Sequence, residues 1–327
     1  MGCVDYWVDT HELIVILKTM ARMLVTGGAG FIGSNLVRRL IALGHEVIIV
    51  DNLSTGIREN IPEGVQFYQL DIREVETYNL ILDVKPEYIF HLAAQIDVRK
   101  SVDEPQFDAE VNILGTLNLL RAAQKVKVNR FIFSSSGGVL YGNTNVPVDE
   151  TYPINPISPY GISKWVGELY CNFFYREFGV PIVSLRYANV YGPRQNPLGE
   201  AGVVAIFASR MLRGDPCILY GYGKPVRDYV YVEDVVEANI LAMHKGEGEA
   251  FNIGTGRGTT VEQLFRMMAD IIGYKVAPIY KPKRAGELDS SMVDYSKAKR
   301  VLGWEPKVTL EEGLRRTIDW FRDKVKL

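Results

Sequence analysis

The stretch MLVTGGAGFIG, residues 23–33, decides the fold of this chain of 327 residues. It begins as a short apolar strand, passes through Gly27, Gly30 and Gly33, and leads into a helical pattern of apolar residues over 34–43. Glycines at this spacing allow a tight turn, a close approach of the backbone to a diphosphate and close packing of the helix on the strand. The N–H groups and the dipole of the helix N-terminus favour a bound phosphate. The stretch therefore predicts a dinucleotide site, with a purely structural glycine turn as the alternative.

A carboxylate at the end of the next strand indicates which dinucleotide is bound. The expected strand 46–50, apolar from Val47 to Val50, is followed by Asp51, which lies 18 residues after Gly33. That is close to the spacing of the acid that accepts a hydrogen bond from the adenosine ribose in such folds. Because a carboxylate there would repel a 2′-phosphate, the sequence predicts NAD rather than NADP.

Tyr160 and Lys164 form the most informative pair of polar residues in the chain. They lie four residues apart in a segment, 160–178, that contains no proline and has apolar residues at helical spacing. Four residues make about one helical turn, so both side chains lie on one face. An ammonium group favours a nearby phenolate, and we therefore expect Lys164 to lower the pKa of Tyr160 and Tyr160 to act as a general base. Alone, the pair would equally suit a half-buried helix with a surface lysine.

Strands and helices alternate beyond Asp51. Further strands are expected at 65–70, 88–92, 130–133 and 182–186, and the clearest helices between them at 111–124 and 160–178. This alternation predicts an α/β protein with a Rossmann-type, doubly wound parallel sheet. Ligands bind such sheets beyond the carboxyl ends of the strands. The candidate residues at those ends are Asp51, Asp71, Ala93, Ser134, Ser135, Ser136 and Asn189.

The chain is expected to divide into two parts. Residues 22–186 form the dinucleotide-binding domain, and residues 229–242 return to it. Glycine- and proline-rich turns and a helix at 260–272 make 187–327 mainly a smaller C-terminal α/β lobe for the substrate.

Residues 1–21 form an extension before the first strand. The apolar run 13–17 is too short to span a bilayer, and the acidic residues around it do not suit a signal peptide. We expect a mis-assigned start codon, with Met20 or Met23 as the natural start, or else an additional helix.

Composition is that of a globular enzyme of the cytoplasm. A net charge of −2 without a basic block argues against nucleic acid as a partner. The three cysteines, Cys3, Cys171 and Cys217, are far apart and suit a reducing compartment rather than a disulfide framework. The four histidines have no metal-binding spacing, so no metal is expected. No membrane partner is expected either.

Several stretches, in a common order and spacing over roughly residues 22–322, resemble the extended short-chain dehydrogenase/reductase family. Among its members the UDP-glucose (UDP-galactose) 4-epimerases are the most similar. The stretches are residues 26–33, 51–54, 70–73, 91–94, 134–136, 160–164, 186–193 and 226–230.

This resemblance implies NAD as the cofactor. The residues that it places at NAD are Gly27, Gly30, Phe31, Ile32, Gly33, Asp51, Asn52, Ser54, Asp71, Ile72, Leu92, Ala93, Ala94, Tyr160 and Lys164.

The resemblance also implies the reaction. Ser136, Tyr160 and Lys164 would catalyse the 4-epimerisation of a UDP-hexose, UDP-galactose to UDP-glucose. Tyr160 takes the proton of the 4-hydroxyl while NAD oxidises C4, and the transient 4-keto sugar is then reduced on its opposite face. Ser135 stays open as an alternative to Ser136, because the segment after the serines, residues 137–140, is one residue longer than in many relatives.

The UDP-sugar would be held by Ser136, Asn189, Arg227, Arg284 and Glu287. Glu287 stands where relatives usually carry Asp. Gln95 stands near a position where some relatives hold the diphosphate with lysine, and Arg99 is the alternative contact. Ser291 replaces a large aromatic residue of some relatives, so UDP-N-acetylhexosamines are also expected to fit.

Three rival functions fit the sequence less well. A UDP-glucuronate 4-epimerase would need a carboxylate-binding group that the sequence does not identify. A nucleotide-sugar 4,6-dehydratase needs an acid directly after the catalytic hydroxyl, where this chain has Gly137 and Gly138. A non-catalytic NAD-binding regulator typically loses the tyrosine or the lysine.

The resemblance further implies a homodimer. Helices 160–178 and 111–124 would pack against their symmetry mates. Leu169, Phe173 and Phe174 suit either that interface or the core.

Overall fold

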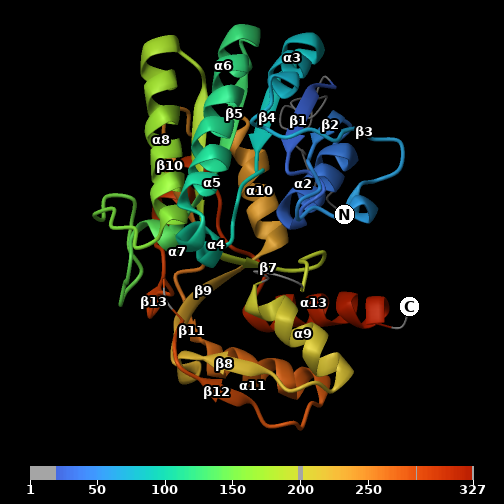
Figure 1. The fold of residues 1–327 in the computed structure, drawn as a ribbon, viewed down its shortest axis with the longest axis vertical. Coiled ribbons are helices and arrows are strands. Elements are labelled where there is room, and N and C mark those ends of the chain that lie inside the picture. The colour runs from blue at the N-terminus through green and yellow to red at the C-terminus, as the bar shows by residue number, and fades with distance from the viewer. Residues whose placement is uncertain (1–19, 198–201, 285, 326–327) are drawn as a thin grey trace, which may run out of the picture.

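The computed structural model describes residues 20–197, 202–284 and 286–325, and its larger part is built on one parallel sheet (Figure 1). In this described part the sheet has seven strands in the order β10-β6-β5-β4-β1-β2-β3. Their bounds are β1 Arg22–Thr26, β2 Glu46–Val50, β3 Gln66–Tyr68, β4 Tyr88–His91, β5 Arg130–Ser136, β6 Ile182–Tyr187 and β10 Ala250–Ile253. Strand order reverses beside β1, which creates the crevice in which doubly wound sheets bind their ligands.

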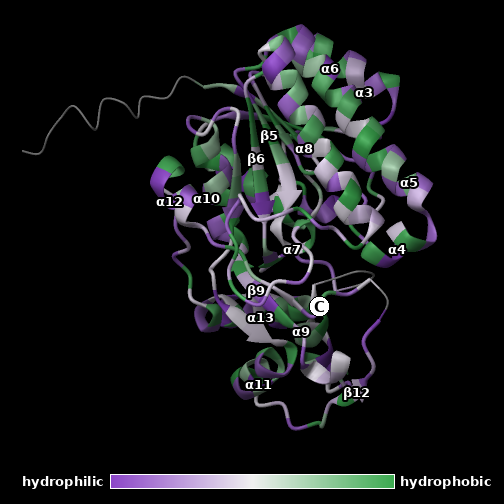
Figure 2. Cartoon of the chain, turned by 90° about the vertical axis from the view of Figure 1, so that its left-hand side faces the viewer, coloured by the Kyte–Doolittle hydropathy of each residue, from purple (hydrophilic) through white to green (hydrophobic). Residues whose placement is uncertain are grey.

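Helices cover both faces of this sheet, as Figure 2 shows with the strands between two helical layers. One face carries α2 (Phe31–Ala42), α10 (Val232–Ala242) and α12 (Ser296–Leu302); the other carries α3 (Val75–Val84), α6 (Thr116–Val126) and α8 (Pro159–Phe178). Strands covered on both faces have continuous apolar runs, such as residues 47–50 of β2. The predicted doubly wound fold is therefore confirmed.

A smaller lobe lies below the carboxyl ends of these strands in Figure 1. Strand β9 (Val226–Tyr231) is its centre and pairs with β7 (Asn189–Tyr191), β11 (Gly258–Thr260) and β13 (Ser290–Ser291). A second, two-stranded sheet joins β8 (Ile218–Tyr220) to β12 (Ile279–Lys281). Three helices share its apolar core: α9 Val203–Arg213, α11 Val261–Ile272 and α13 Leu310–Val325.

The C-terminal half of the chain contributes to both parts of the molecule. Of the segment 229–242, residues 229–231 belong to β9 in the smaller lobe, whereas α10 packs on α2 beside the large sheet. Strand β10 and helix α12 also return to the large sheet. Chain order alone does not reveal these later returns, because β10 joins the sheet through pairing with the distant strand β6.

The segment 111–124, expected to be one α-helix, is α-helical only in its second half. A π-helical segment, Glu110–Gly115 (η2), precedes α6 and follows the short helices α4 (Val98–Asp103) and α5 (Pro105–Ala109). Such segments are common at functional sites, where they redirect a side chain. The side chain of Asn112 on η2 faces inward and is 3% exposed.

Helix α8 agrees closely with the expected segment. Ser158 caps its start by accepting a hydrogen bond from the Gly161 N–H at 3.2 Å. Gly179 ends it in the left-handed conformation that glycine adopts readily, with φ of 65°.

The described residues contain neither a helix long and apolar enough to cross a membrane nor a group of side chains that could hold a metal ion. Cys171 and Cys217 are buried free thiols. Residues 1–19, most of the expected N-terminal extension, lie outside the described part.

Candidate active site

The glycine turn after β1 has no room for larger side chains. Gly27 has φ of +73°, and a Cβ on it would lie 2.7 Å from the Ala93 backbone nitrogen. A Cβ on Gly33 would lie 2.1 Å from the Gly27 carbonyl oxygen. Gly30 begins α2 without a side-chain cap, and Phe31 and Ile32 form its first turn. The turn therefore fits a dinucleotide diphosphate, which the N–H groups of this helix end can bind.

Asp51 is fixed against the same turn. Its carboxylate accepts hydrogen bonds from the Ala29 N–H at 3.0 Å and the Leu53 N–H at 2.8 Å, and it is 7% exposed. Burial raises the pKa of Asp51 above its usual value. The Gly30 N–H is a further backbone partner, and since a carboxylate accepts about four hydrogen bonds, capacity remains for a ribose hydroxyl.

The loops after β2 and β3 meet beside Asp51. Asn52 donates to Asp71 at 2.9 Å and accepts from the Ser54 N–H at 2.9 Å. Burial raises the pKa of Asp71, but hydrogen bonds from Arg73 and Asn52 outweigh this effect and hold it below its usual value. Ile72 is 3% exposed and belongs to the apolar core under this loop.

The residues at the end of β4 form a further part of the dinucleotide crevice. Leu92, Ala93 and Ala94 follow the strand, and the Ala93 N–H donates to the Thr26 hydroxyl at 3.2 Å. His91 lies beneath them, 2.9 Å from both the Thr26 and the Thr116 hydroxyls. Burial lowers the pKa of His91 to about 3, so the ring is neutral and structural.

Tyr160, Lys164 and Ser136 meet where α8 passes the end of β5. The hydroxyl of Ser136 forms a hydrogen bond with Tyr160. Lys164 Nζ donates to the Ser134 carbonyl oxygen at 2.9 Å and lies 5.2 Å from the centre of the Phe133 ring. The proposed base, its lysine and a serine hydroxyl are therefore brought together.

The prediction that the pKa of Tyr160 is lowered is wrong, because this pKa is raised. Burial raises this pKa well above its usual range, Asp108 adds to the rise, and the Ser136 hydrogen bond only partly opposes it. The physical reason is desolvation, which penalises the phenolate more than the sequence spacing suggested. Burial also lowers the pKa of Lys164 to about 8.

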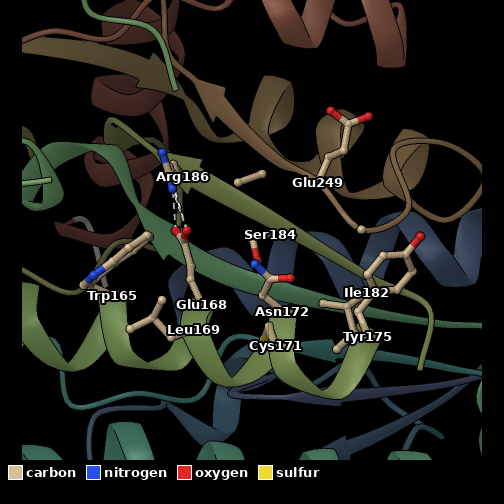
Figure 3. Close-up of a pocket in the computed structure, with 12 residues that line it drawn as sticks. Trp165, Glu168, Leu169, Cys171, Asn172, Tyr175, Ile182, Ser184, Arg186 and Glu249 are labelled. Carbon is tan, nitrogen blue, oxygen red and sulfur yellow. Dashed lines mark hydrogen bonds and ion pairs between the residues drawn. The ribbon is translucent and has the colours of Figure 1, made fainter. Parts of the chain in front are cut away.

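Ser135 points to a different partner. Its hydroxyl donates to the carboxylate of Glu168 on α8, which in turn binds the guanidinium of Arg186 on β6 at 2.7–3.1 Å. Both charged side chains are 6% exposed. Figure 3 shows them facing each other beside a hollow of about 130 Å³. Because Ser135 is bound to Glu168, the geometry favours Ser136 as the serine that faces Tyr160.

The buried polar partners of helix α8 were missed by the sequence analysis. Asp108, Asn112, Glu168 and Arg186 are each at most 6% exposed. One signal was present: a charged residue in an otherwise apolar strand, such as Arg186, requires a partner of opposite charge.

A cavity of about 310 Å³ opens between the sheet and the smaller lobe. It is lined by four of the five residues expected to hold the UDP-sugar, Asn189, Arg227, Arg284 and Glu287. They come from distant parts of the sequence, and the fold gathers them around one space.

The arginines of this cavity differ in their surroundings. Arg227 donates to the carbonyl oxygens of Val226 and Leu288, at 2.9 and 2.8 Å, and burial lowers its pKa. Arg284 lies 3.9 Å from the centre of the Tyr220 ring and binds Glu287 at 2.7 Å. Arg99 also lines the cavity.

Gln95 is engaged elsewhere. It is 9% exposed, and its amide nitrogen donates to Asp108 at 3.0 Å and to the Asp97 carbonyl oxygen at 2.9 Å.

Comparison with known proteins gives a family for this arrangement. The model of the NAD dependent epimerase/dehydratase family matches residues 23–254. The chain belongs to this family. The match contains the glycine turn, Tyr160, Lys164 and Arg227, so the family assignment rests on the same segments that form the site.

Individual members of the epimerase/dehydratase family align over nearly the full chain. A crystal structure of UDP-glucose 4-epimerase with UDP-glucose, from Thermotoga maritima, is 56% identical, has a TM-score of 0.91, and the match covers 93% of this chain and 99% of that one. The Thermus thermophilus UDP-glucose 4-epimerase in complex with NAD is 46% identical, with a TM-score of 0.88 and coverage of 92% and 99%. A UDP-glucose 4-epimerase of Mycolicibacterium smegmatis is 45% identical over 93% of this chain and 99% of its own length.

Proposed function

We propose that this protein is an NAD-dependent isomerase that epimerises a UDP-hexose at C4 and interconverts UDP-galactose and UDP-glucose. The observation that carries the proposal is that Gly138, which lines the cavity together with Arg227 and Arg284, lies beside Ser136, the partner of Tyr160: a Cβ on Gly138 would lie 3.8 Å from the Ser136 hydroxyl oxygen. The relatives named UDP-glucose 4-epimerase support the same reaction, since they match over nearly their whole lengths.

NAD fits the crevice that the glycine turn begins. Gly27, Gly30 and Gly33 leave space for its diphosphate, and Asp51 can accept from its ribose. When bound, NAD supplies the hydride acceptor and donor that a change of configuration at C4 requires.

The protein side chains handle the proton. Tyr160 takes the proton of the sugar 4-hydroxyl and later returns it, and Ser136 can hydrogen-bond the same oxygen. The positive charge of Lys164 favours the tyrosinate during this transfer. Arg227 and Arg284 hold the diphosphate through charge-assisted hydrogen bonds, so the sugar can turn while the nucleotide stays bound.

A single assay tests the proposal. Purified protein is incubated with UDP-galactose without added NAD, and UDP-glucose is followed by chromatography. Product formation supports 4-epimerisation with retained NAD. Its absence even with added NAD would overturn the UDP-galactose assignment and favour UDP-glucuronate, which is assayed in parallel.

The dehydratase alternative lacks a proton donor at the required place. Helix α7 (Gly137–Leu140) begins directly after Ser136, and a Cβ on Gly137 would lie 2.9 Å from Val293 and 3.0 Å from the Arg186 carbonyl oxygen. An acidic side chain therefore does not fit at this position without displacing β6 or the segment around Val293.

Replacing Arg227 by Ala is expected to weaken substrate binding. A hydrogen bond to a charged group contributes about 1.5–3 kcal/mol, so KM for UDP-galactose should rise about 10- to 100-fold with a smaller change in kcat. The exposed Arg257→Ala, on the neighbouring segment of the lobe, is the control and should leave KM unchanged. An unchanged KM in Arg227→Ala would remove this residue from the diphosphate site.

Ser291 supports acceptance of N-acetylated sugars. It is 4% exposed and lies opposite Arg227 in the pairing of β13 with β9. We expect turnover of UDP-N-acetylgalactosamine by the wild type and, because a large ring fills the space, a loss of at least about tenfold in Ser291→Tyr. UDP-galactose turnover in the same variant is the control. Failure of the wild type to convert the N-acetylated sugar would contradict this prediction.

A homodimer and a cytoplasmic location complete the proposal. Leu169 and Phe173 on α8 are each 48% exposed, whereas Phe174 is 5% exposed and belongs to the core. The first two are therefore available for a helix of a second copy. The buried free thiols of Cys171 and Cys217 suit a reducing compartment.

A further inference from the structure

Glu168 is a buried carboxylate for which the mechanism above has no role. It is 6% exposed and lies on α8, two turns after Tyr160 and one turn after Lys164. Because about 3.6 residues make one turn, Tyr160, Lys164 and Glu168 form a stripe along one face of the helix. A buried charge is costly unless polar groups compensate it, so the partners of Glu168 indicate what it does.

The first two members of this stripe contact serines at the carboxyl end of β5. Tyr160 forms a hydrogen bond with the Ser136 hydroxyl, and Lys164 Nζ donates to the Ser134 carbonyl oxygen at 2.9 Å. Helix and strand therefore meet at two successive turns. The position of α8 relative to β5 sets how the base faces the serine hydroxyl.

Glu168 makes a third contact with β5 and extends it to the next strand. Its carboxylate accepts from the Ser135 hydroxyl on β5, and it binds the guanidinium of Arg186 on β6 at 2.7–3.1 Å. Ser135 and Arg186 lie opposite each other in the pairing of these two strands. One carboxylate therefore fixes α8 to both strands, through hydrogen bonds that are strong because they involve ionised groups.

The segment after Ser136 is connected to the same carboxylate through Arg186. The Nη1 atom of Arg186 donates to the hydroxyl of Tyr141, the residue directly after α7, at 2.7 Å. Tyr141 in turn donates to Asn252 Oδ1 on β10 at 2.7 Å. Ser136 is therefore held from both sides, by Ser135 before it and by the α7 segment after it.

Helix and strand also approach closely at the residue before Glu168. A Cβ on Gly167 would lie 2.6 Å from Cζ of Phe133 on β5. Because no side chain of α8 separates the two elements here, the bonds of Glu168 act on the helix close to the strand. They leave little freedom for α8 to slide or rotate against β5.

The proposed reaction depends on this arrangement. Proton transfer requires the hydroxyls of Tyr160, Ser136 and the sugar at hydrogen-bond distance, and a misplacement of about 1 Å can lower a rate by about 10²-fold. A contact two turns from the base can fix the helix without using a group that moves a proton.

We propose that Glu168 is a positioning residue of the active site, which through Ser135 and Arg186 holds helix α8 against the end of β5 and so sets how Tyr160 meets Ser136. This proposal rests on the function proposed above for the same site.

Ser135→Ala tests the proposal, because it removes one bond of Glu168 and leaves the ion pair with Arg186 intact. We expect kcat for UDP-galactose to fall about tenfold. KM should stay within about twofold, since Arg227 and Arg284 lie on other elements. A wild-type kcat, or a loss confined to KM, would overturn the proposal. Ser135→Cys, with a much weaker donor of similar size, takes its place if Ser135→Ala does not fold.

A double variant separates positioning from direct participation of Ser135. If Ser135 acts through Ser136, adding Ser135→Ala to Ser136→Ala should lower kcat by less than about a further twofold. Losses that multiply in full would show independent roles and contradict the proposal. Ser184→Ala is the matched control, because it removes the same oxygen from the neighbouring strand β6 beside the hollow of Figure 3, and it should keep the wild-type kcat.

Amide hydrogen exchange gives a readout that needs no sugar. A peptide covering the first turns of α8, residues 159–169, is followed in the NAD-loaded enzyme. We expect faster exchange in Ser135→Ala than in the wild type, because a released helix end opens more often, whereas Ser184→Ala should exchange like the wild type. Unchanged exchange in Ser135→Ala would sink the proposal whatever the substrate. A wild type that does not convert UDP-galactose would instead remove the function proposed above.

Discussion

Tyr160→Phe is expected to lower kcat for conversion of UDP-galactose to UDP-glucose by about 10³-fold, the usual contribution of a positioned general acid–base group. The substitution removes only the hydroxyl that hydrogen-bonds Ser136 and leaves the half-buried ring in place. NAD content and the unfolding midpoint should stay close to those of the wild type. Chromatography of the product at saturating substrate measures the effect.

A control for this prediction lies on the same helix. Tyr170 is 36% exposed, and Tyr170→Phe should retain full activity. If Tyr160→Phe kept more than about a tenth of the wild-type kcat, another group would have to transfer the proton, and the catalytic assignment would be wrong.

Glu168→Gln is expected to cause the largest loss of stability. Burial lowers the pKa of Arg186, but its bonds to Glu168 outweigh this effect and raise the pKa above the usual value, so the guanidinium stays charged. Without the carboxylate a buried cation is left without a counter-charge, which costs about 3–5 kcal/mol. Denaturant unfolding of the purified variant measures the loss.

Two further variants test the cause of that loss. Glu177→Gln, on the exposed side of the same helix, should change stability by less than about 0.5 kcal/mol. Adding Arg186→Met to Glu168→Gln removes the stranded charge and should restore part of the stability. No recovery in the double variant would show that packing, rather than charge, causes the loss.

The elements that the sequence predicted best are those whose cause is local. Gly27, Gly30 and Gly33 lie within seven residues and specify the turn by their own backbone freedom. The spacing of Tyr160 and Lys164 on one helix needs only the helical period. The doubly wound parallel sheet was also accessible, because alternating strands and helices permit few arrangements.

Other features depend on residues that are far apart in the sequence. The predicted direction of the Tyr160 pKa was wrong because burial under the assembled fold, together with Asp108, raises this pKa. Sequence left Ser135 and Ser136 open, and the contact of Ser135 with Glu168 separates them. The sequence also left open whether Leu169, Phe173 and Phe174 face an interface or the core. In the structure Phe174 packs in the core, and Leu169 and Phe173 face outward.

The dinucleotide turn, the α/β architecture and the pair of Tyr160 and Lys164 follow from the order of residues along the chain, since local spacing dictates each of them. The folded arrangement is needed to bring Asn189, Arg227, Arg284 and Glu287 around one cavity and to set which charges lie beside Tyr160. Burial and proximity arise when distant segments pack together. They set the pKa values and the partners of polar groups, and no local pattern records them.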